Sequence, residues 1–146
     1  MDDSRQIENL LYRYAKRIDA GDFEGVAELF RHGCICAAGA DPVQGYDAVL
    51  QLYRSSTRLY DNGTPCTRHI TSNALIEVDG ENATCHSYFT VMQALPDFPL
   101  QAIISGHYED RFQRRDDRWT FDCRTMFPEL FGDLSRHLLF DLQPPG

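Results

Sequence analysis

The sequence predicts an α+β fold in which helices come first and a long antiparallel sheet follows, and three observations predict it. Apolar residues recur at helical spacing in the first third of the chain. Four long β-rich runs follow, and their short connections favour antiparallel pairing of consecutive strands. The chain has 146 residues, of which 42% are hydrophobic and 25% charged, and this length and composition are typical of a globular domain with one hydrophobic core. We therefore expect a single domain over residues 1–146, with a curved sheet wrapped around the helices and a hollow between them.

Two helices are expected at the start of the chain. One apolar face predicts a helix from about residue 4 to 20, with Asp3 and Gln6 resembling a capping box and Gly21 supplying the stop. Asp22 can cap a second, short helix. The apolar faces consist of Ile7, Leu10, Leu11, Tyr14, Ala15 and Ile18 in the first helix and of Phe23, Val26, Ala27 and Phe30 in the second.

A buried strand, a third helix and the long strands make up the rest. The stretch CICAA, residues 34–38, predicts a buried strand, and an apolar periodicity that includes Tyr53 indicates a helix within residues 46–60. The tail, residues 130–142, contains apolar side chains that need a surface to cover. We expect it either to lid the hollow or to cross to a neighbouring subunit. The long strands are expected at residues 66–78, 83–94, 100–113 and 117–127.

Charge and targeting signals exclude several classes of function. The net charge of −8, with basic residues spread along the chain, argues against a nucleic-acid partner. No apolar run approaches the 18 residues of a membrane span, and the polar start MDDSRQIENL does not resemble a signal peptide. The five cysteines are odd in number and lack a C-x-x-C pair, so we expect reduced thiols, a cytoplasmic location and no metal site.

Asp19 and His69 are the first candidates for chemistry. Asp19 lies in the last turn of the first helix, where a negative charge opposes the helix dipole. It is either a turn-forming residue or a partly buried carboxylate aimed into the hollow. His69 begins a β-rich run and is either a structural histidine or the working group of a pocket. A carboxylate bonded to one imidazole nitrogen fixes the tautomer and makes the other nitrogen more basic, which is why the two residues would suit each other.

Two further side chains could stabilise charge. Arg124 lies among apolar residues of the last strand, so it either pairs with a buried acid or binds a substrate oxygen that gains negative charge. Tyr14 lies in the middle of the first apolar face and is either a core residue or a hydroxyl donor to a cavity.

His86 and His107 lie on later strands and compete with His69 for its role. No phosphate-binding loop, dinucleotide fingerprint or nucleophile elbow is present.

Three stretches resemble SnoaL-like proteins of the nuclear transport factor 2-like superfamily. IENLLYRYAKRIDAGDFEGVAELF resembles their first two helices, TRHITSNALIEVDGENATCHSYFTV their central hairpin, and GHYEDRFQRRDDRWTFDCR their last two strands. The resemblance covers about residues 5–131. It implies a cone-shaped α+β barrel with a deep apolar pocket, in a homodimer or homotrimer.

Within this superfamily, the chain resembles one branch more specifically, and that branch contains scytalone dehydratase, a dehydrochlorinase and a bile-acid dehydratase. Asp19 and His69 fall where this branch has a catalytic aspartate and histidine. Arg124 resembles an arginine of the dehydrochlorinase, and Tyr14 resembles a tyrosine of the bile-acid enzyme. His86 is a candidate for the second histidine of scytalone dehydratase. The residues that we place at the substrate pocket are His86, Tyr53, Tyr88 and Phe127.

The resemblance implies a lyase or isomerase without a cofactor, acting on a small hydrophobic, cyclic molecule. In that reading His69 removes a C–H proton, Asp19 holds its ring, and Tyr14 and Arg124 stabilise the charge that develops. Two alternatives stay open. The domain could bind a small ligand or serve as a scaffold subunit without chemistry, or it could be a polyketide cyclase in which Asp19 matters more than His69. We expect no nucleic-acid or membrane partner.

Overall fold

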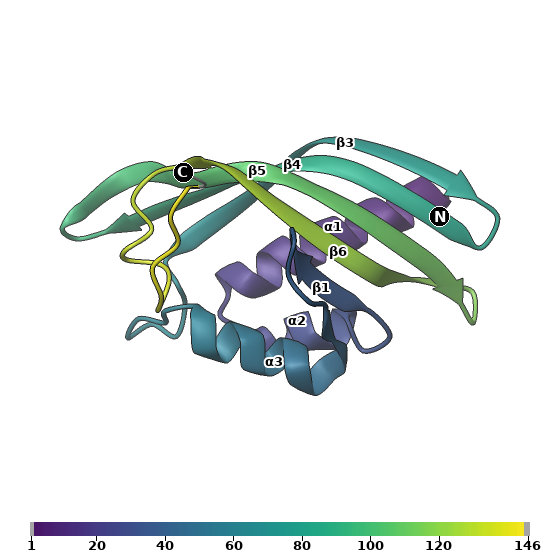
Figure 1. Ribbon diagram of the computed structural model, residues 1–146, viewed down its shortest axis with the longest axis horizontal. Helices are drawn as coiled ribbons and strands as arrows, with labels where there is room; N and C mark the ends of the chain where they lie inside the picture. The colour runs from purple at the N-terminus through teal and green to yellow at the C-terminus, as the bar shows by residue number, and fades with distance from the viewer. Residues whose placement is uncertain (1, 145–146) are drawn as a thin grey trace.

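The computed structural model describes residues 2–144, which form three helices and six strands (Figure 1). In chain order these are α1 (Asp3–Asp19), α2 (Phe23–Leu29), β1 (Cys34–Ala37), β2 (Val43–Gln44), α3 (Gly45–Ser56), β3 (Thr67–Asp79), β4 (Asn82–Leu95), β5 (Phe98–Arg115) and β6 (Arg118–Phe131). The helices therefore precede the long strands, as the periodicity predicts. The two-residue strand β2 was not expected, because so short an element carries no alternation.

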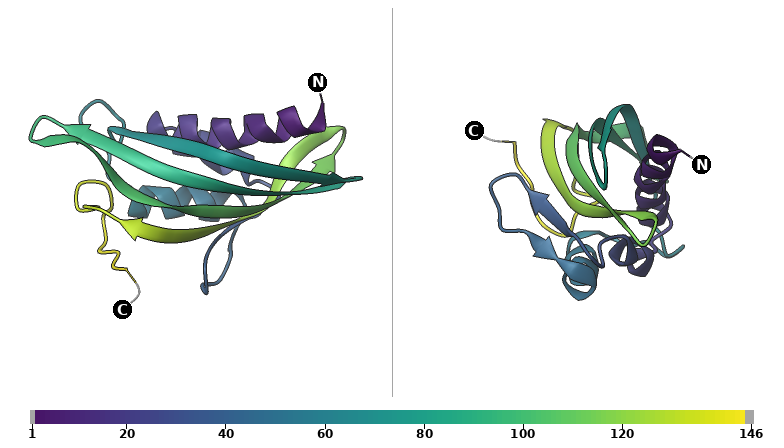
Figure 2. Two further views of the ribbon diagram at one scale, coloured as in Figure 1. Left: turned by 90° about the horizontal axis from the view of Figure 1, so that it is seen from above. Right: turned by 90° about the vertical axis from the view of Figure 1, so that its right-hand side faces the viewer.

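The strands form one curved sheet in the order β2-β1-β6-β5-β4-β3. The four long strands pair antiparallel, which confirms the expected meander. However, β1 runs parallel to β6, so the sheet is mixed, and it stays open because β2 and β3 form its two edges. At the entry to β1 the two backbones approach closely: a Cβ on Gly33 would lie 2.3 Å from the carbonyl oxygen of Phe121. Figure 2 shows the sheet curling around the helices, in agreement with the predicted α+β class.

Helix α1 packs along the concave side of the sheet against β3. Its buried residues are the predicted apolar face. The predicted capping box is wrong by one residue, because the N-cap is Asp2, whose carboxylate accepts from the Arg5 amide at 2.7 Å. Asp3 lies within the first turn and instead accepts from the Trp119 indole at 2.9 Å, which ties the start of α1 to β6. None of the helices described in residues 2–144 is long and apolar enough to cross a bilayer.

The two faces of the sheet follow from strand alternation. Along β4, Phe89 and Val91 are buried while His86 and Tyr88 are exposed, so odd-numbered residues face the helices. On β3, His69 is half-buried and faces the same way, opposite Val91. A register shift between Ser72 and Leu75, with Asn73 at φ 54°, then inverts the alternation of β3. The bulge therefore lets the start of β3 present polar side chains inward and its end present apolar ones.

The C-terminal segment, residues 132–144, covers the open end of the sheet beside α3 (Figure 1). The amide of Leu139 donates to the Ser56 carbonyl at 2.9 Å, and the amide of Arg58 donates to the His137 carbonyl at 2.8 Å. Leu134 is buried in the core. The segment lines a cavity of its own chain, which agrees with the first of the two expectations for the tail.

Candidate active site

A cavity of about 450 Å³ lies between the concave face of the sheet, α1, α3 and the C-terminal segment. This volume falls within the range of small-molecule sites. Its lining is mainly apolar and comes from every layer of the fold. The side chains with proton-transfer or hydrogen-bonding groups that interrupt that lining are Tyr14, Asp41, Tyr53, Ser56, Thr57, His69, Tyr108 and His137.

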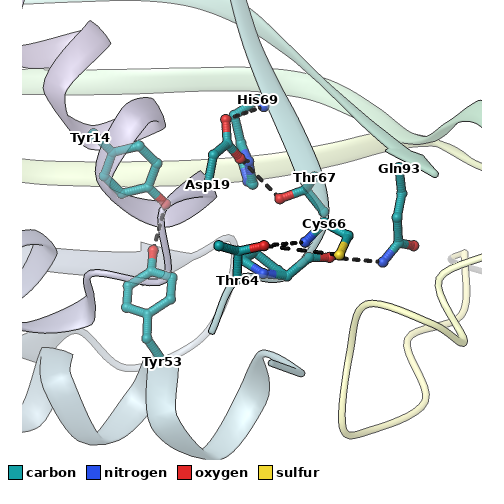
Figure 3. A network of polar contacts seen from close by, with 9 residues as sticks. Tyr14, Asp19, Tyr53, Thr64, Cys66, Thr67, His69 and Gln93 are labelled. Carbon is teal, nitrogen blue, oxygen red and sulfur yellow. Dashed lines mark hydrogen bonds and ion pairs between the residues drawn. The ribbon is translucent and has the colours of Figure 1, made fainter. Parts of the chain in front are cut away.

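Asp19 and His69 form a hydrogen-bonded pair at the wall of this cavity (Figure 3). The carboxylate Oδ1 lies 2.6 Å from the His69 Nδ1, and Oδ2 accepts from the His69 backbone amide at 2.8 Å. The Thr67 hydroxyl donates to Oδ1 at 2.9 Å. Because Nδ1 is taken by the carboxylate, Nε2 is the ring nitrogen that is available to a molecule in the cavity. The structure thus brings together the two residues that the sequence paired.

The hydrogen bonds on Asp19 decide its charge. Burial alone would raise the pKa of the carboxyl, and the end of the helix dipole acts in the same direction. The bonds from the His69 ring and amide and from Thr67 outweigh both and hold the pKa of Asp19 below its ordinary value. A carboxylate that stays ionised can hold the ring in one tautomer and stabilise the imidazolium that forms when Nε2 takes a proton.

The loop before β3 positions the C-terminal end of α1 next to the first residues of β3. Gly21 follows α1 with φ 73°, and a Cβ there would lie 2.0 Å from the Gly63 carbonyl oxygen. Only glycine allows this backbone conformation and this contact together. The last turn of α1 therefore rests directly on the loop that leads into β3, and the Asp19 carboxylate meets the first residues of that strand.

Tyr14 and Tyr53 point their hydroxyl groups at each other across the cavity wall (Figure 3). The two oxygens are 2.5 Å apart, and Tyr53 lies on α3 while Tyr14 lies on α1. Burial raises the pKa of both phenols, for Tyr53 well above its ordinary value, although the nearby Arg124 acts against this. Both hydroxyls therefore stay protonated and can donate hydrogen bonds. Tyr53 lines the cavity, as the sequence predicted for it.

His137 is a cavity residue that the sequence reading missed. Its ring lies 6.1 Å from the His69 ring, centroid to centroid, and its side chain is almost completely buried. Within residues 2–144 its Nδ1 has no hydrogen-bond partner. Burial, and then the neighbouring His69, lower the pKa of His137 to about 4, so the ring is neutral near pH 7. Its position in an irregular tail, without strand or helix periodicity, gave no signal in the sequence.

Arg124 does not reach the cavity, contrary to the expectation that it contacts substrate. Its guanidinium is fully buried and forms two bonds to Asp110, at 2.8 and 3.0 Å. It lies 3.6 Å from the centroid of the Tyr108 ring and 4.3 Å from that of Tyr14. Burial lowers the pKa of the guanidinium, but the carboxylate beside it prevails and raises it, so Arg124 stays charged. The other reading in the sequence, an arginine paired with a buried acid, describes what the structure shows.

Three of the four expected pocket residues lie on the opposite face of the sheet. His86 and Tyr88 occupy exposed positions of β4, and Phe127 stacks on the ring of His107 on the same outer face, with centroids 4.5 Å apart. These placements were wrong because the sequence did not reveal which positions of each strand face inward. His86 is therefore not a second histidine of the cavity.

Comparisons with known proteins agree with this architecture. The profile of the SnoaL-like domain family matches residues 1–125. A variant of Rv3472, a Mycobacterium tuberculosis protein of unknown function, is 28% identical, with a TM-score of 0.72 over 86% of this chain and 71% of that chain. Among curated proteins, none matches the sequence.

Two further solved structures share the fold at lower identity. A protein described as a scytalone dehydratase from Novosphingobium aromaticivorans is 22% identical, with a TM-score of 0.68 over 87% of this chain and 84% of that chain. LinA is 19% identical, with a TM-score of 0.71 over 97% of this chain and 94% of that chain. At these identities the likeness concerns the fold.

Proposed function

The chain belongs to the SnoaL-like domain family, and from this premise we propose that it is a cofactor-independent lyase or isomerase of the dehydratase type. Its substrate is a small, hydrophobic, cyclic molecule with an acidic C–H bond next to a carbonyl. The observation that carries the proposal is the 2.6 Å contact between Asp19 and His69 at the wall of an apolar cavity. Proton transfers by these residues are sufficient for the chemistry.

His69 acts as the general base in this mechanism. Its Nε2 takes the proton from the carbon next to the carbonyl, and the electrons of the C–H bond move toward the carbonyl oxygen to give an enolate. Asp19 offsets the positive charge that the ring gains, because its carboxylate is bonded to Nδ1. A base positioned in this way contributes about 10²–10⁴-fold to the rate.

The two tyrosines are suited to the enolate oxygen. Tyr14 and Tyr53 are protonated donors in a lining that is otherwise mainly apolar, where a hydrogen bond to developing charge is strengthened. A substrate carbonyl would break their mutual contact and accept from the hydroxyl groups. Arg124 stacks on the Tyr14 ring from outside the cavity and is a positioning residue for it.

The enolate then follows one of two courses. In elimination, it expels a hydroxyl group from the next carbon, the new C=C bond forms as the C–O bond breaks, and the proton on His69 leaves with the hydroxyl as water. In isomerisation, His69 returns its proton to another carbon of the conjugated system. The neutral ring of His137 lies beside His69, and within residues 2–144 its Nδ1 has no partner, so it can hydrogen-bond to the polar group that departs or moves.

The test is turnover of a panel of cyclic hydroxyketones and unsaturated ketones by the wild type and by His69→Gln. The variant should lose at least about 10²-fold in rate while it keeps the fold and the affinity for an unreactive ketone. His32→Gln, at an exposed position after α2, is the matched control and should retain full rate.

Three results would contradict the proposal. Full activity in a folded His69→Gln protein would remove the base from the mechanism. Binding of ketones without turnover by the wild type, unchanged in His69→Gln, would indicate a ligand-binding protein. If Asp19→Asn abolished turnover while His69→Gln did not, the acid/base role would pass to Asp19, as in the cyclase alternative.

A further inference from the structure

A second cluster of ionisable side chains lies on the outer face of the sheet, on the other side from the cavity. It consists of His86 on β4, His107 and Glu109 on β5, and Glu129 on β6. Strand pairing sets His86 directly opposite Glu109, and His107 is two residues from Glu109 on the same face. The proposed reaction uses none of these residues.

We propose that His86, His107 and Glu109 form a binding site for a divalent transition-metal ion such as zinc. One donor atom from each residue lies within 4.8 Å of the other two. The Nε2 of His107 and the carboxylate of Glu109 are already 3.0 Å apart. Zinc ligands at metal distances of about 2.0–2.2 Å are separated by about 3.4 Å in a tetrahedral site. Two of the three donors therefore have nearly the required spacing.

Glu129 contacts the nitrogen of His107 that would not bind the ion, and so it orients the ring. Its carboxylate oxygen lies 2.9 Å from the Nδ1 of His107, on the opposite side of the ring from Glu109. The contact fixes the ring and leaves Nε2 as the ligating nitrogen, which is the arrangement of carboxylate, histidine and metal found in zinc sites. The ring of Phe127, stacked on His107 at 4.5 Å, limits its rotation from the other side.

His86, the third ligand, has to change its side-chain conformation to bind the ion, and its exposed position allows this change. The His86 ring is stacked on that of His107 at 4.8 Å with an angle of 18° between the planes, so the two rings do not yet converge on one point. His86 is exposed and can turn its ring toward the ion. The face is open, which leaves the remaining coordination position to water. The donor set of two imidazoles and one carboxylate favours zinc and its neighbours over magnesium or calcium.

The charges around the cluster suit a cation. The adjoining hollow is lined by the acidic residues Glu77 and Glu109. The one cationic side chain in that lining, Arg111, is turned toward Asp122, with Nε and Oδ2 3.5 Å apart. An ion bound by Nε2 of His107 and by the Glu109 carboxylate would lie between these two groups, in place of their present direct contact. The two local glutamates, Glu109 and Glu129, would then balance its charge.

Sequence spacing did not reveal the complete set of three ligands. The ligands come from two strands about 20 positions apart in the chain, and only the register between β4 and β5 brings them together. His107 and Glu109 are two residues apart on β5, but a single pair at this spacing is too common in strands to indicate a metal site without the third ligand.

The test is calorimetric titration of the full chain with Zn²⁺, together with the visible spectrum of added Co²⁺. We expect one equivalent bound, with the affinity lowered at least about tenfold in His86→Ala and in Glu109→Gln. Glu129→Gln should weaken binding by about 10–100-fold although it does not touch the ion. His32→Ala and Cys123→Ser are the controls for an unrelated imidazole and for a thiol, and both should bind as the wild type does.

Each result bears directly on the proposal. Equal affinity in the wild type, His86→Ala and Glu109→Gln would overturn it, as would loss of binding in Cys123→Ser alone. Because His86 and Glu109 are exposed, their variants should fold normally, which circular dichroism checks. Binding is read without any substrate, so this outcome is independent of whether the proposed reaction is right.

Discussion

At Asp19, burial and the helix end oppose a negative charge, and three hydrogen bonds favour it. The sequence drew attention to this residue because a carboxylate in the last helical turn is disfavoured by the helix dipole. His69 was conspicuous for the same kind of reason, as an ionisable ring at the start of a strand. Both were found because they break a local pattern. His137 was not identified, and the two readings of Arg124 could not be separated, because the surroundings of both residues are set by tertiary packing.

Arg124 and Asp110 should behave as a structural pair. Arg124→Met leaves a buried carboxylate without a partner and should lower the free energy of unfolding by about 3–5 kcal/mol. The double variant Arg124→Met/Asp110→Leu removes both charges and should recover most of that loss. Urea denaturation of the wild type and the two variants measures this difference. A fully stable single variant would show that the pair does not stabilise the fold.

His137 should make stability depend on pH. Its pKa in the folded protein is about 4, against an ordinary value of 6.5 that applies when the chain is unfolded. The unfolded state therefore binds more protons between these values, so the stabilising contribution is complete above pH 6.5 and is lost as the pH falls toward 4. The loss amounts to about 3 kcal/mol.

The matching experiment compares the free energy of unfolding at pH 7 and pH 4 in the wild type and in His137→Gln. The variant lacks the titrating ring, so its stability should fall by about 3 kcal/mol less over this interval. The same fall in both proteins would mean that His137 is free to take a proton in the folded state.

At the scale of elements, the order and type of helices and long strands could be read from apolar periodicity and turn residues. The periods of 3.6 and 2 identify α1, α3 and the four long strands to within a few residues. The face of each strand could not be read, because alternation alone does not tell which set of positions meets the helices. The bulge in β3, at Asn73, moves the apolar positions from one parity to the other. The misplacement of His86, Tyr88 and Phe127 follows from this missing information.

Gly21 should be more sensitive than other glycines of similar conformation. Gly21→Ala strains a backbone at φ 73° and also forces a Cβ to within 2.0 Å of the Gly63 carbonyl oxygen. Gly39→Ala is a matched control, since Gly39 has φ 80° and open space around it. The control should cost about 1–2 kcal/mol in unfolding free energy, and Gly21→Ala clearly more.

Thermal unfolding of the two alanine variants measures the comparison. Because the contact between Gly21 and the Gly63 carbonyl positions the C-terminal end of α1, Gly21→Ala should also displace Asp19 and thereby reduce turnover. Equal destabilisation by the two variants would show that the loop before β3 yields, and that it does not fix the end of the helix.

At the scale of the molecule, the cavity depends on segments that are far apart in the sequence. Gln93 on β4 donates from Nε2 to the carbonyl of Pro65, before β3, and to the carbonyl of Arg136, in the C-terminal segment, both at 3.1 Å. Its side chain is completely enclosed. One amide therefore joins the loop that precedes His69 to the segment that carries His137. Such a junction cannot be anticipated from local patterns.

Gln93→Ala should loosen the closed end of the cavity. The change leaves a buried and a partly buried carbonyl group without that donor and should cost about 1–3 kcal/mol of unfolding free energy. Gln101→Ala is the control, because its amide reaches only the neighbouring Pro99 carbonyl at an exposed position. Limited proteolysis should cleave the C-terminal segment faster in Gln93→Ala than in the wild type or the control. Equal cleavage rates would show that the segment is held without Gln93.

The proposed mechanism requires that Asp19 hold His69 with a proton on Nδ1 and leave Nε2 free to accept one. Long-range ¹H–¹⁵N correlation spectra of the histidine side chains measure this directly in the wild type and in Asp19→Asn, with His69→Gln to assign the signals. We predict that His69 at pH 7.5 shows a protonated Nδ1 and an unprotonated Nε2, and that Asp19→Asn disturbs this tautomer. A wild-type His69 protonated at Nε2 and bare at Nδ1 would contradict this mechanism, because no base would then face the cavity.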